Sequence, residues 1–330
     1  MNSARALPTR ALPRRLHLEV TNGCNSLCTT CVRTRAPEPT VELAPELVER
    51  LLAQLPELES AALQVNGEPL LYRPLPWLVR ELVRRHVHVE LNTNAITLEG
   101  EMARSLVDAQ LPQINISLDG ATASTYARIR GVDAFERVLR NIRHVLRLRG
   151  AAPAPRVVLW VTLSRQNIAE LDSLFDLAVQ LGVDGVYLQR LVFFGYGHAR
   201  AADSLHGRLT RGQSLSVARA TVRARAAGLD VAASGGHAPD AMHRGLAPDA
   251  EPYRACRRPS ESAVVMANGD VVPCCIATFV APRDAITMGN LKRQSLAEIW
   301  SGERYREWRE GLRRGEAPEA CVRCGVSWSL

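Results

Sequence analysis

Short apolar segments alternate with amphipathic ones from Leu16 to Ala227. The β-branched segment Arg156–Leu163 is typical of a buried strand, and apolar residues over 134–148 recur at the spacing of one helix face. Further strands are predicted over 16–20, 60–65, 87–91, 113–118 and 185–189, and further helices over 44–55, 76–85, 98–109, 168–181 and 213–227. This alternation predicts an α/β fold with a parallel sheet and helices outside, either open or closed into a barrel.

Polar side chains recur near the carboxyl ends of the predicted strands. They are Gln64, Asn66, Glu90, Asn92, Asn94, Asn115, Ser117, Asp119 and Gln189. Alternate residues of a strand share one face, and in a parallel barrel that end of the strands lines the active site. Exposure to solvent at a strand end is enough to explain each polar side chain by itself. Their recurrence on several strands favours a polar pocket.

The last third of the chain predicts a smaller unit. Residues 197–249 have weak periodicity outside their helix, and we interpret their second half as a linker. Asn268-Gly269 lies between apolar segments and predicts a hairpin with a type I′ turn. Ser295 and Glu298 form a capping-box pattern that opens a helix extending to Leu312.

Composition and charge narrow the class of protein. The 330 residues are 46% hydrophobic, which excludes a mostly disordered chain. The net charge of +7 is spread along the sequence, so nucleic acid is an unlikely partner. Residues 1–15 have no apolar core of a secretory signal, and no apolar run approaches the roughly 18 residues of a membrane span. We therefore expect no membrane partner and a location in the reducing cytoplasm, where clustered cysteines indicate metal ligation.

The first cysteine group follows the first predicted strand, as Cys24-Asn-Ser-Leu-Cys28-Thr-Thr-Cys31. Three thiolates on one short loop can hold three irons of a cubane cluster and leave the fourth iron open to an outside molecule. The alternative is a three-cysteine zinc site completed by His17 or a distant histidine.

The order of motifs after this loop resembles the radical S-adenosylmethionine (SAM) superfamily. Asn66-Gly67-Glu68-Pro69 is similar to the Gly-Gly-Glu-Pro motif of that family, which meets the amino group of SAM, although Asn66 replaces the first glycine. The segment with Asn94 resembles its Thr-Asn-Gly segment, and Ser117 to Gly120 resembles its Ser-Leu-Asp-Gly segment, so the resemblance implies SAM contacts at Asn94, Ser117 and Asp119.

The same resemblance implies the fold and the chemistry. It carries over a partial (β/α)6 barrel, with Thr162 and Leu188 where the ribose and adenine of SAM are usually contacted. A [4Fe–4S] cluster, reduced by a flavodoxin- or ferredoxin-type donor, would cleave SAM to a 5′-deoxyadenosyl radical that abstracts a hydrogen atom from the substrate.

A second cysteine group lies near the other end of the chain. Cys256, Cys274, Cys321 and Cys324 supply four thiolates, which by spacing alone also suit structural zinc. The segment resembles the SPASM/Twitch extensions of radical SAM enzymes, and its cysteine number implies one auxiliary [4Fe–4S] cluster. Cys275 is left over, as a small buried residue, an alternate ligand or a thiol that faces the substrate.

These observations predict four segments and one function. The segments are a 1–15 extension, a 16–234 radical SAM core, a 235–251 linker and a 252–330 small C-terminal iron–sulfur domain of SPASM/Twitch type. The expected function is a net oxidation in biosynthesis, with the auxiliary cluster as electron acceptor and a base to take the proton. From position alone, the candidates for that catalytic group are Glu19, Glu90 and Arg190.

The substrate is the open question. Only about 15 residues precede the first strand, so we expect no fused peptide-recognition domain. That expectation and the polar strand ends favour a small polar metabolite of sugar, cyclitol or nucleoside type in secondary metabolism over a peptide. The alternatives are a peptide- or protein-modifying radical SAM enzyme and a non-catalytic iron–sulfur or zinc protein.

Overall fold

One ten-stranded sheet organises the described part of the chain, in the order β10-β9-β8-β1-β2-β3-β4-β5-β6-β7. The computed structural model describes residues 12–34, 39–191, 199–234, 238–242, 253 and 256–322. From β1 to β7 every neighbouring pair is parallel, as the alternation of strands and helices predicts. These strands are β1 (Arg15–Leu18), β2 (Ser60–Leu63), β3 (His88–Thr93), β4 (Gln113–Ser117), β5 (Arg156–Leu163), β6 (Gly185–Arg190) and β7 (Asp230–Ala233).

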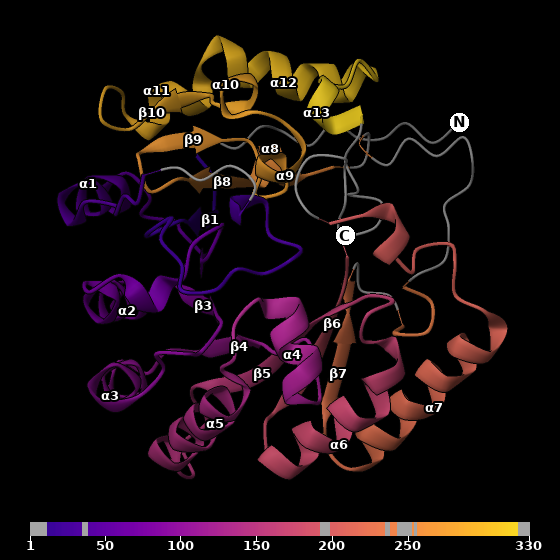
Figure 1. Ribbon diagram of the computed structural model, residues 1–330. Helices are drawn as coiled ribbons and strands as arrows, with labels where there is room; N and C mark the ends of the chain where they lie inside the picture. The colour runs from indigo at the N-terminus through magenta and orange to yellow at the C-terminus, as the bar shows by residue number, and fades with distance from the viewer. Residues whose placement is uncertain are drawn as a thin grey trace.

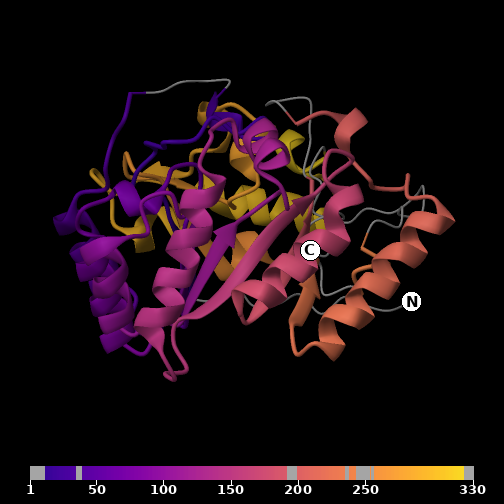
Figure 2. The same cartoon turned by 60° about the horizontal axis from the view of Figure 1, so that its bottom comes forward.

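Helices cover the outer face of this parallel sheet (Figure 1). They are α1 (Pro45–Ala53), α2 (Leu75–Arg84), α3 (Gly100–Asp108), α4 (Ala123–Arg130), α5 (Phe135–Arg149), α6 (Leu171–Leu181) and α7 (Arg211–Ala226), with short 3-10 helices η1 (Val32–Thr34), η2 (Pro69–Leu71), η3 (Ile168–Glu170) and η4 (Ala201–Asp203). Helices α5, α6 and α7 pack in succession and can be followed from magenta to orange in Figure 2. Their apolar faces hold them to the sheet: Val138, Ile142 and Val145 of α5 are fully buried, and each such side chain contributes about 1.5–3 kcal/mol.

Two elements of the core do not follow from the apolar pattern. Helix α4 is short and buries only Thr125, Tyr126 and Ile129, so its periodicity is faint. Strand β7 has the sequence Asp-Val-Ala-Ala, and Asp and Ala are poor strand formers. It forms because it pairs with β6 along the edge of the sheet, which adds a seventh strand to the six that were predicted.

The C-terminal hairpin extends the same sheet. Strand β8 (Ser262–Val265) lies parallel to β1, with Leu16 opposite Ala263, and β9 (Asp270–Val272) returns antiparallel to β8. The two-residue strand β10 (Gly289–Asn290) completes this edge. The predicted hairpin is therefore present, and it is joined to the core by backbone hydrogen bonds. The predicted linker, 235–251, lies largely outside the described residues.

The turn of this hairpin is not the predicted type I′ turn. Gly269 has a φ of +91°, but Asn268 is not among the residues with positive φ. The Gly269 N–H donates to the Met266 carbonyl, and the Met266 N–H donates to the Asp270 carbonyl, each at 2.8 Å. This pattern is a three-residue loop with a type I turn and a glycine bulge. The Asn268 side chain instead accepts from the Asp270 N–H at 3.0 Å.

The C-terminal helices pack over the hairpin (Figure 1). They are α8 (Arg258–Glu261), α9 (Ala277–Val280), α10 (Arg283–Ile286), α11 (Leu296–Ser301), α12 (Glu303–Arg314) and α13 (Glu319–Val322). The predicted capping box is present, because Ser295 and Glu298 each accept from the other's backbone N–H. The single helix predicted from Ser295 to Leu312 is wrong, since Gly302 is extended and separates α11 from α12.

Candidate functional site

The loop with the first three cysteines runs from the end of β1 to η1 and is held by the end of α4. The Leu27 N–H donates to the Arg130 carbonyl at 3.2 Å, and the Thr29 N–H donates to the Ile129 carbonyl at 2.9 Å. Gly131 has a φ of +67°, and a Cβ there would lie 2.2 Å from the Leu27 carbonyl oxygen. Glycine therefore permits both the helix end and this close approach.

The three thiols suit an iron–sulfur cluster. Burial raises the pKa of Cys28 to about 11 and also raises that of Cys24, so binding a metal here would release protons. Within the described ranges, no three His, Cys, Asp or Glu side chains converge as ligands of a single ion would. In a cubane each iron takes one soft thiolate, so Cys24, Cys28 and Cys31 need not meet at one point.

The predicted SAM motif after β2 packs directly on this loop. The Glu68 N–H donates to the Gly23 carbonyl at 2.8 Å. A Cβ on Gly67 would lie 1.9 Å from the Thr21 carbonyl oxygen, so no larger residue fits. The buried Asn66 Oδ1 has no hydrogen-bond partner among the described residues. It is an acceptor of the kind that the amino group of a ligand needs.

Glu68 and Asn94 join the ends of β2 and β3 to the loop. The Glu68 carboxylate is 2% exposed and accepts from Thr93 Oγ1 at 2.6 Å and from the Asn94 N–H at 2.7 Å. Burial raises its pKa, and these bonds act in the opposite direction. The Asn94 side-chain amide then donates to Asn25 Oδ1 at 2.7 Å and to Ser26 Oγ at 3.0 Å. The Asn94 side chain therefore contacts the cysteine loop directly, and the Glu68 carboxylate holds Asn94 in place. Pro69 begins the 3-10 helix that follows.

Asp119 connects the end of β4 to β5 and α4. One carboxylate oxygen accepts from the Thr162 N–H at 2.7 Å, and the other pairs with Arg130 at 3.0 Å. Ser117 is the last residue of β4 and lies opposite Trp160. The structure thus gathers Ser117, Asp119 and Thr162 at neighbouring strand ends, as predicted for a shared site.

A ladder of amides crosses the same face of β3 and β4. Gln113 Nε2 donates to Asn115 Oδ1 at 2.8 Å, and Asn115 Nδ2 donates to Asn92 Oδ1 at 2.8 Å. Glu90 Oε2 lies 3.4 Å from the same Asn115 nitrogen. The polar residues that alternate along these strands are therefore hydrogen-bonded to one another, rather than only to solvent at the strand ends.

The next two strands place aromatic rings beside this ladder. Trp160 of β5 and Tyr187 of β6 have ring centroids 4.1 Å apart, and the Trp160 indole donates to Gln189. Gln189 lies opposite Thr162, on the same face. The Leu188 side chain is fully buried on the other face, within the hydrophobic core. Its backbone, rather than its side chain, is what a ligand near Thr162 could contact.

The three candidates for a proton-transfer group lie on different strands. Glu19 follows β1 and is 2% exposed; it accepts from the Ala267 N–H at 3.1 Å. Burial raises the pKa of Glu19, and hydrogen bonds from Ala267 and Asn66 act in the opposite direction. Glu90 belongs to the amide ladder. Arg190 ends β6, where burial lowers its pKa to about 10, so it remains a cation at neutral pH.

The described auxiliary cysteines come from three segments that lie close together. Cys274 precedes α9, and α13, which carries Cys321, packs against α9. The pKa of Cys256 is raised by burial and further by the nearby Cys275 thiol, which accepts from Arg258 Nη1 at 3.5 Å. Cys324 lies outside the described residues. Cys274 and Cys321 thus lie on segments that meet, and Cys256 lies near Cys275, which follows Cys274 in the chain.

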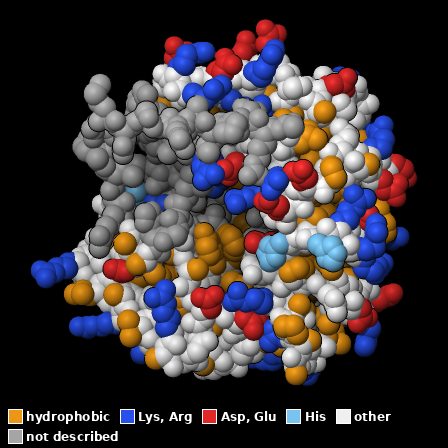
Figure 3. Space-filling view, turned by 180° about the vertical axis from the view of Figure 1, so that it is seen from behind, with side chains coloured by type: hydrophobic (Ala, Val, Ile, Leu, Met, Phe, Trp, Pro, Cys, Tyr) orange, Lys and Arg blue, Asp and Glu red, His pale blue; other side chains and the backbone are white. Residues whose placement is uncertain are grey.

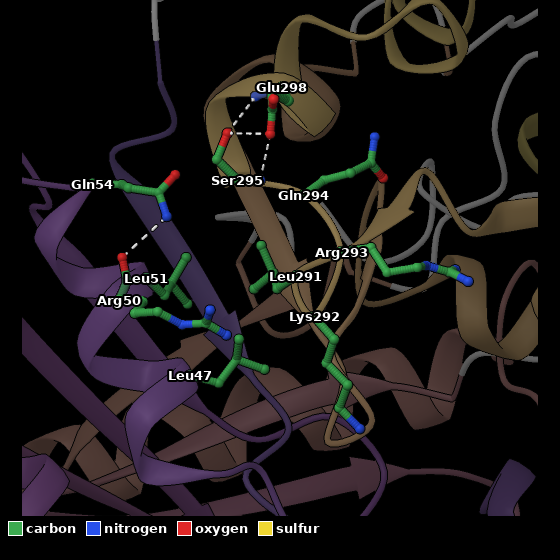
Figure 4. Close-up of a pocket in the computed structure, with 10 residues that line it drawn as sticks. All are labelled: Leu47, Arg50, Leu51, Gln54, Leu291, Lys292, Arg293, Gln294, Ser295 and Glu298. Carbon is green, nitrogen blue, oxygen red and sulfur yellow. Dashed lines mark hydrogen bonds between the residues drawn. The ribbon is translucent and has the colours of Figure 1, made fainter.

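A pocket of about 320 Å³ lies between α1 and the segment after β10 (Figure 4). Leu47, Leu51 and Leu291 are among its apolar lining, and Arg50 and Lys292 among its cations. It contains none of the predicted site residues. On the face opposite to the view of Figure 1, the positive and negative side chains of the described residues are interspersed and form no continuous basic band (Figure 3).

Sequence reasoning missed the place of Arg130 beside the cysteine loop. Its backbone holds the cysteine loop and its side chain pairs with Asp119. The available signals were Thr122, which caps α4 by accepting from the Thr125 N–H, and Gly131 at the other end of that helix. A cap and a terminal glycine that flank a mostly polar helix of eight residues are weak signals beside long apolar periodicity.

Family models match two regions of the chain. Residues 18–178 match the Radical SAM superfamily, and residues 256–325 match SPASM, an iron–sulfur cluster-binding domain. Together the matches cover well over half of the sequence. The chain therefore belongs to the radical SAM superfamily of enzymes, which bind a [4Fe–4S] cluster and SAM. Within it, the chain falls in the subgroup with a SPASM domain, which binds auxiliary iron–sulfur clusters.

Individual relatives differ in what they are named for. The chain is 29% identical over 165 residues to the mycofactocin maturase MftC of Mycobacterium tuberculosis, an alignment that covers 50% of this chain and 41% of that protein. It is 28% identical over 302 residues to the pre-heme d1 synthase of Dinoroseobacter shibae, an alignment that covers 86% of this chain and 72% of that protein.

A solved structure shares the fold. SuiB of Streptococcus suis, bound to the precursor peptide SuiA, aligns with a TM-score of 0.72 and 17% identity over 96% of this chain and 73% of SuiB. This likeness concerns the fold alone. A membrane-crossing helix, which needs both length and an apolar sequence, is absent from the residues that the structure describes.

Proposed function

We propose that this chain removes a hydrogen atom from an unactivated carbon of a small polar metabolite, in a net oxidation. Cys24, Cys28 and Cys31 would hold a [4Fe–4S] cluster and leave one iron for SAM. When bound and reduced, this pair supplies a 5′-deoxyadenosyl radical. The observation that carries the proposal is a three-thiol loop held at once by Glu68, Asn94 and the end of α4.

The residues around the loop divide into two roles. Glu68 and Asp119 already accept several internal hydrogen bonds, so we assign them to positioning the loop and the strand ends. Asn66 has a buried oxygen without a partner, which suits the amino group of SAM. The full set proposed to line the SAM site is Asn66, Gly67, Glu68, Pro69, Asn94, Ser117, Asp119, Thr162 and the backbone of Leu188.

The substrate proposal rests on the inner face of the sheet. The amide ladder and Gln189 offer neutral donors and acceptors, and the rings of Trp160 and Tyr187 lie beside them. Hydroxyl groups of a sugar, cyclitol or nucleoside would exchange bonds with such amides, and an apolar ring face would stack on the aromatic pair. One relative, the pre-heme d1 synthase of Dinoroseobacter shibae, is named for a small-molecule product.

The oxidation needs a base and an electron acceptor. Glu19 is the candidate that the geometry favours, because it is buried and lies between β1 and the hairpin of the SPASM region. Cys256, Cys274, Cys321 and Cys324 would hold the auxiliary cluster that accepts the electron. A flavodoxin- or ferredoxin-type donor, in the reducing cytoplasm, would reduce the first cluster.

A peptide substrate is the second candidate. The similarity to a maturase and the fold shared with SuiB, a protein solved with a precursor peptide, support it. The two candidates separate in one experiment. The reconstituted full chain is incubated with SAM, dithionite and substrates deuterated at their C–H positions, and deuterium is traced into 5′-deoxyadenosine. We expect transfer from a polar metabolite; transfer only from peptides would favour the second candidate.

A control separates catalysis from unrelated cleavage of SAM. The Cys28→Ser chain, treated in the same way, should form neither deuterated nor undeuterated 5′-deoxyadenosine above background. If the native chain forms none with any substrate class, and contains zinc without sulfide, the proposed chemistry is wrong and a non-catalytic scaffold remains.

A further inference from the structure

Arg130 carries a buried charge at the end of α4. Its side chain is 14% exposed, and Nη1 forms an ion pair with Asp119 Oδ2 at 3.0 Å. Its buried Nε has no hydrogen-bond partner among the described residues. A buried guanidinium with part of its donor set unused is costly unless another negative group lies close by.

The same residue contacts the cysteine loop directly. The Arg130 carbonyl accepts from the Leu27 N–H, the residue before Cys28. The guanidinium of the same residue is mostly buried at this helix end, so its charge is held next to the loop. Arg130 therefore places a fixed positive charge, partly neutralised by Asp119, at this corner of the loop.

We propose that Arg130 is a positioning residue that supplies a counter-charge to the first cluster and thereby raises its reduction potential. The inference rests on the proposed [4Fe–4S] site at Cys24, Cys28 and Cys31. A cluster with three thiolates is anionic, and the electron from the donor makes it more so. A fixed cation nearby stabilises the reduced form more than the oxidised form. No atom is transferred; only the electron equilibrium shifts.

Because Arg130 and Asp119 have opposite charges, removing each charge should shift the midpoint potential of the first cluster in opposite directions. In Arg130→Met, which keeps the length of the side chain, the midpoint potential of the first cluster should fall. In Asp119→Asn, which can still accept from the Thr162 N–H, it should rise. Arg130→Lys should restore most of the potential lost in Arg130→Met. Arg128→Met is the matched control, because Arg128 is exposed on the same helix and bonds Thr125 and Gln166 instead.

Each variant is prepared as the full chain, reconstituted anaerobically and titrated without SAM, with reduction followed by electron paramagnetic resonance. Iron and sulfide are measured beside it, and the auxiliary cluster serves as an internal reference whose potential should stay constant. Equal potentials in the native chain, Arg130→Met and Asp119→Asn, at equal iron content, would overturn the inference. A native chain that assembles no cluster at all would instead overturn the proposed function.

Loss of the cluster in Arg130→Met is distinguishable from loss of the charge. The backbone bond to Leu27 remains in every variant, so we expect iron content to stay near that of the native chain. If Arg130→Met fails to assemble, the shift in Asp119→Asn decides: a rise supports the counter-charge, and an unchanged potential contradicts it.

Discussion

The two cysteine groups of this chain are built in different ways. Cys24, Cys28 and Cys31 lie within one short loop, and neighbouring strands and a helix end hold that loop through side-chain and backbone hydrogen bonds. Cys256, Cys274 and Cys321 come from separate segments that the hairpin and short helices bring together. A local loop with three ligands suits a site that must keep one metal corner open, whereas a site closed by distant segments suits a permanent structural or electron-transfer role.

Loss of one loop cysteine should be the most damaging change. Cys28→Ser removes a ligand from a site with only three, and we expect formation of 5′-deoxyadenosine to fall at least about a thousandfold. Cys275→Ser is the control, since Cys275 is the surplus cysteine. Product is quantified by liquid chromatography. An equal loss of 5′-deoxyadenosine formation in both variants would contradict a specific role of the loop cysteines in that reaction.

The second largest effect is expected from Gly67, which packs against the cysteine loop. Gly67→Ala forces a Cβ against the Thr21 carbonyl oxygen, so we expect it to lower the free energy of unfolding by about 2 to 3 kcal/mol and to lower the iron content of the first site. Gly212→Ala is the control for backbone effects, because Gly212 is not among the glycines with positive φ and the nearest atom to a Cβ there is Thr210 Oγ1, at 4.0 Å. Denaturant unfolding and iron analysis make the comparison; a native-like Gly67→Ala would contradict the described packing.

The auxiliary site should be separable from the first. Cys256→Ser should lose the second cluster while formation of 5′-deoxyadenosine stays within about threefold of the native rate, because the loop and its supports are untouched. Turnover to oxidised product should stop. Iron and sulfide content are measured together with both products. A Cys256→Ser chain that still oxidises substrate would remove the electron-acceptor role.

The smallest effect is expected from His17, a half-buried histidine of β1. Burial lowers the pKa of His17 to about 4, from the ordinary value of 6.5. The unfolded chain therefore takes up a proton before the folded chain does, and stability is lost as the pH falls from about 6.5 to about 4. Over that pH range, the free energy of unfolding of His17→Gln should fall less steeply with decreasing pH than that of the native chain. Parallel curves for the two chains would contradict the assignment.

Much of the core was readable because its signals are local. The strand–helix alternation and the capping box at Ser295 each depend on a few neighbouring residues, and the structure has both. The cysteine spacing is likewise a local pattern. What could not be read depends on partners far away in sequence. Strand β7 exists because β6 offers it an edge, the turn at Asn268 follows the register of β8 and β9, and Arg130 matters only because α4 ends against Leu27.

The pairing of β8 with β1 has a consequence for how this protein can be dissected. A chain cut before β8 would leave the strand that leads to Cys24 without one of its two neighbours, and would expose its unpaired N–H and C=O groups and its apolar residues Leu16 and Leu18 to solvent. Such bare edges recruit other chains and drive aggregation. The catalytic half is thus expected to be insoluble when expressed alone.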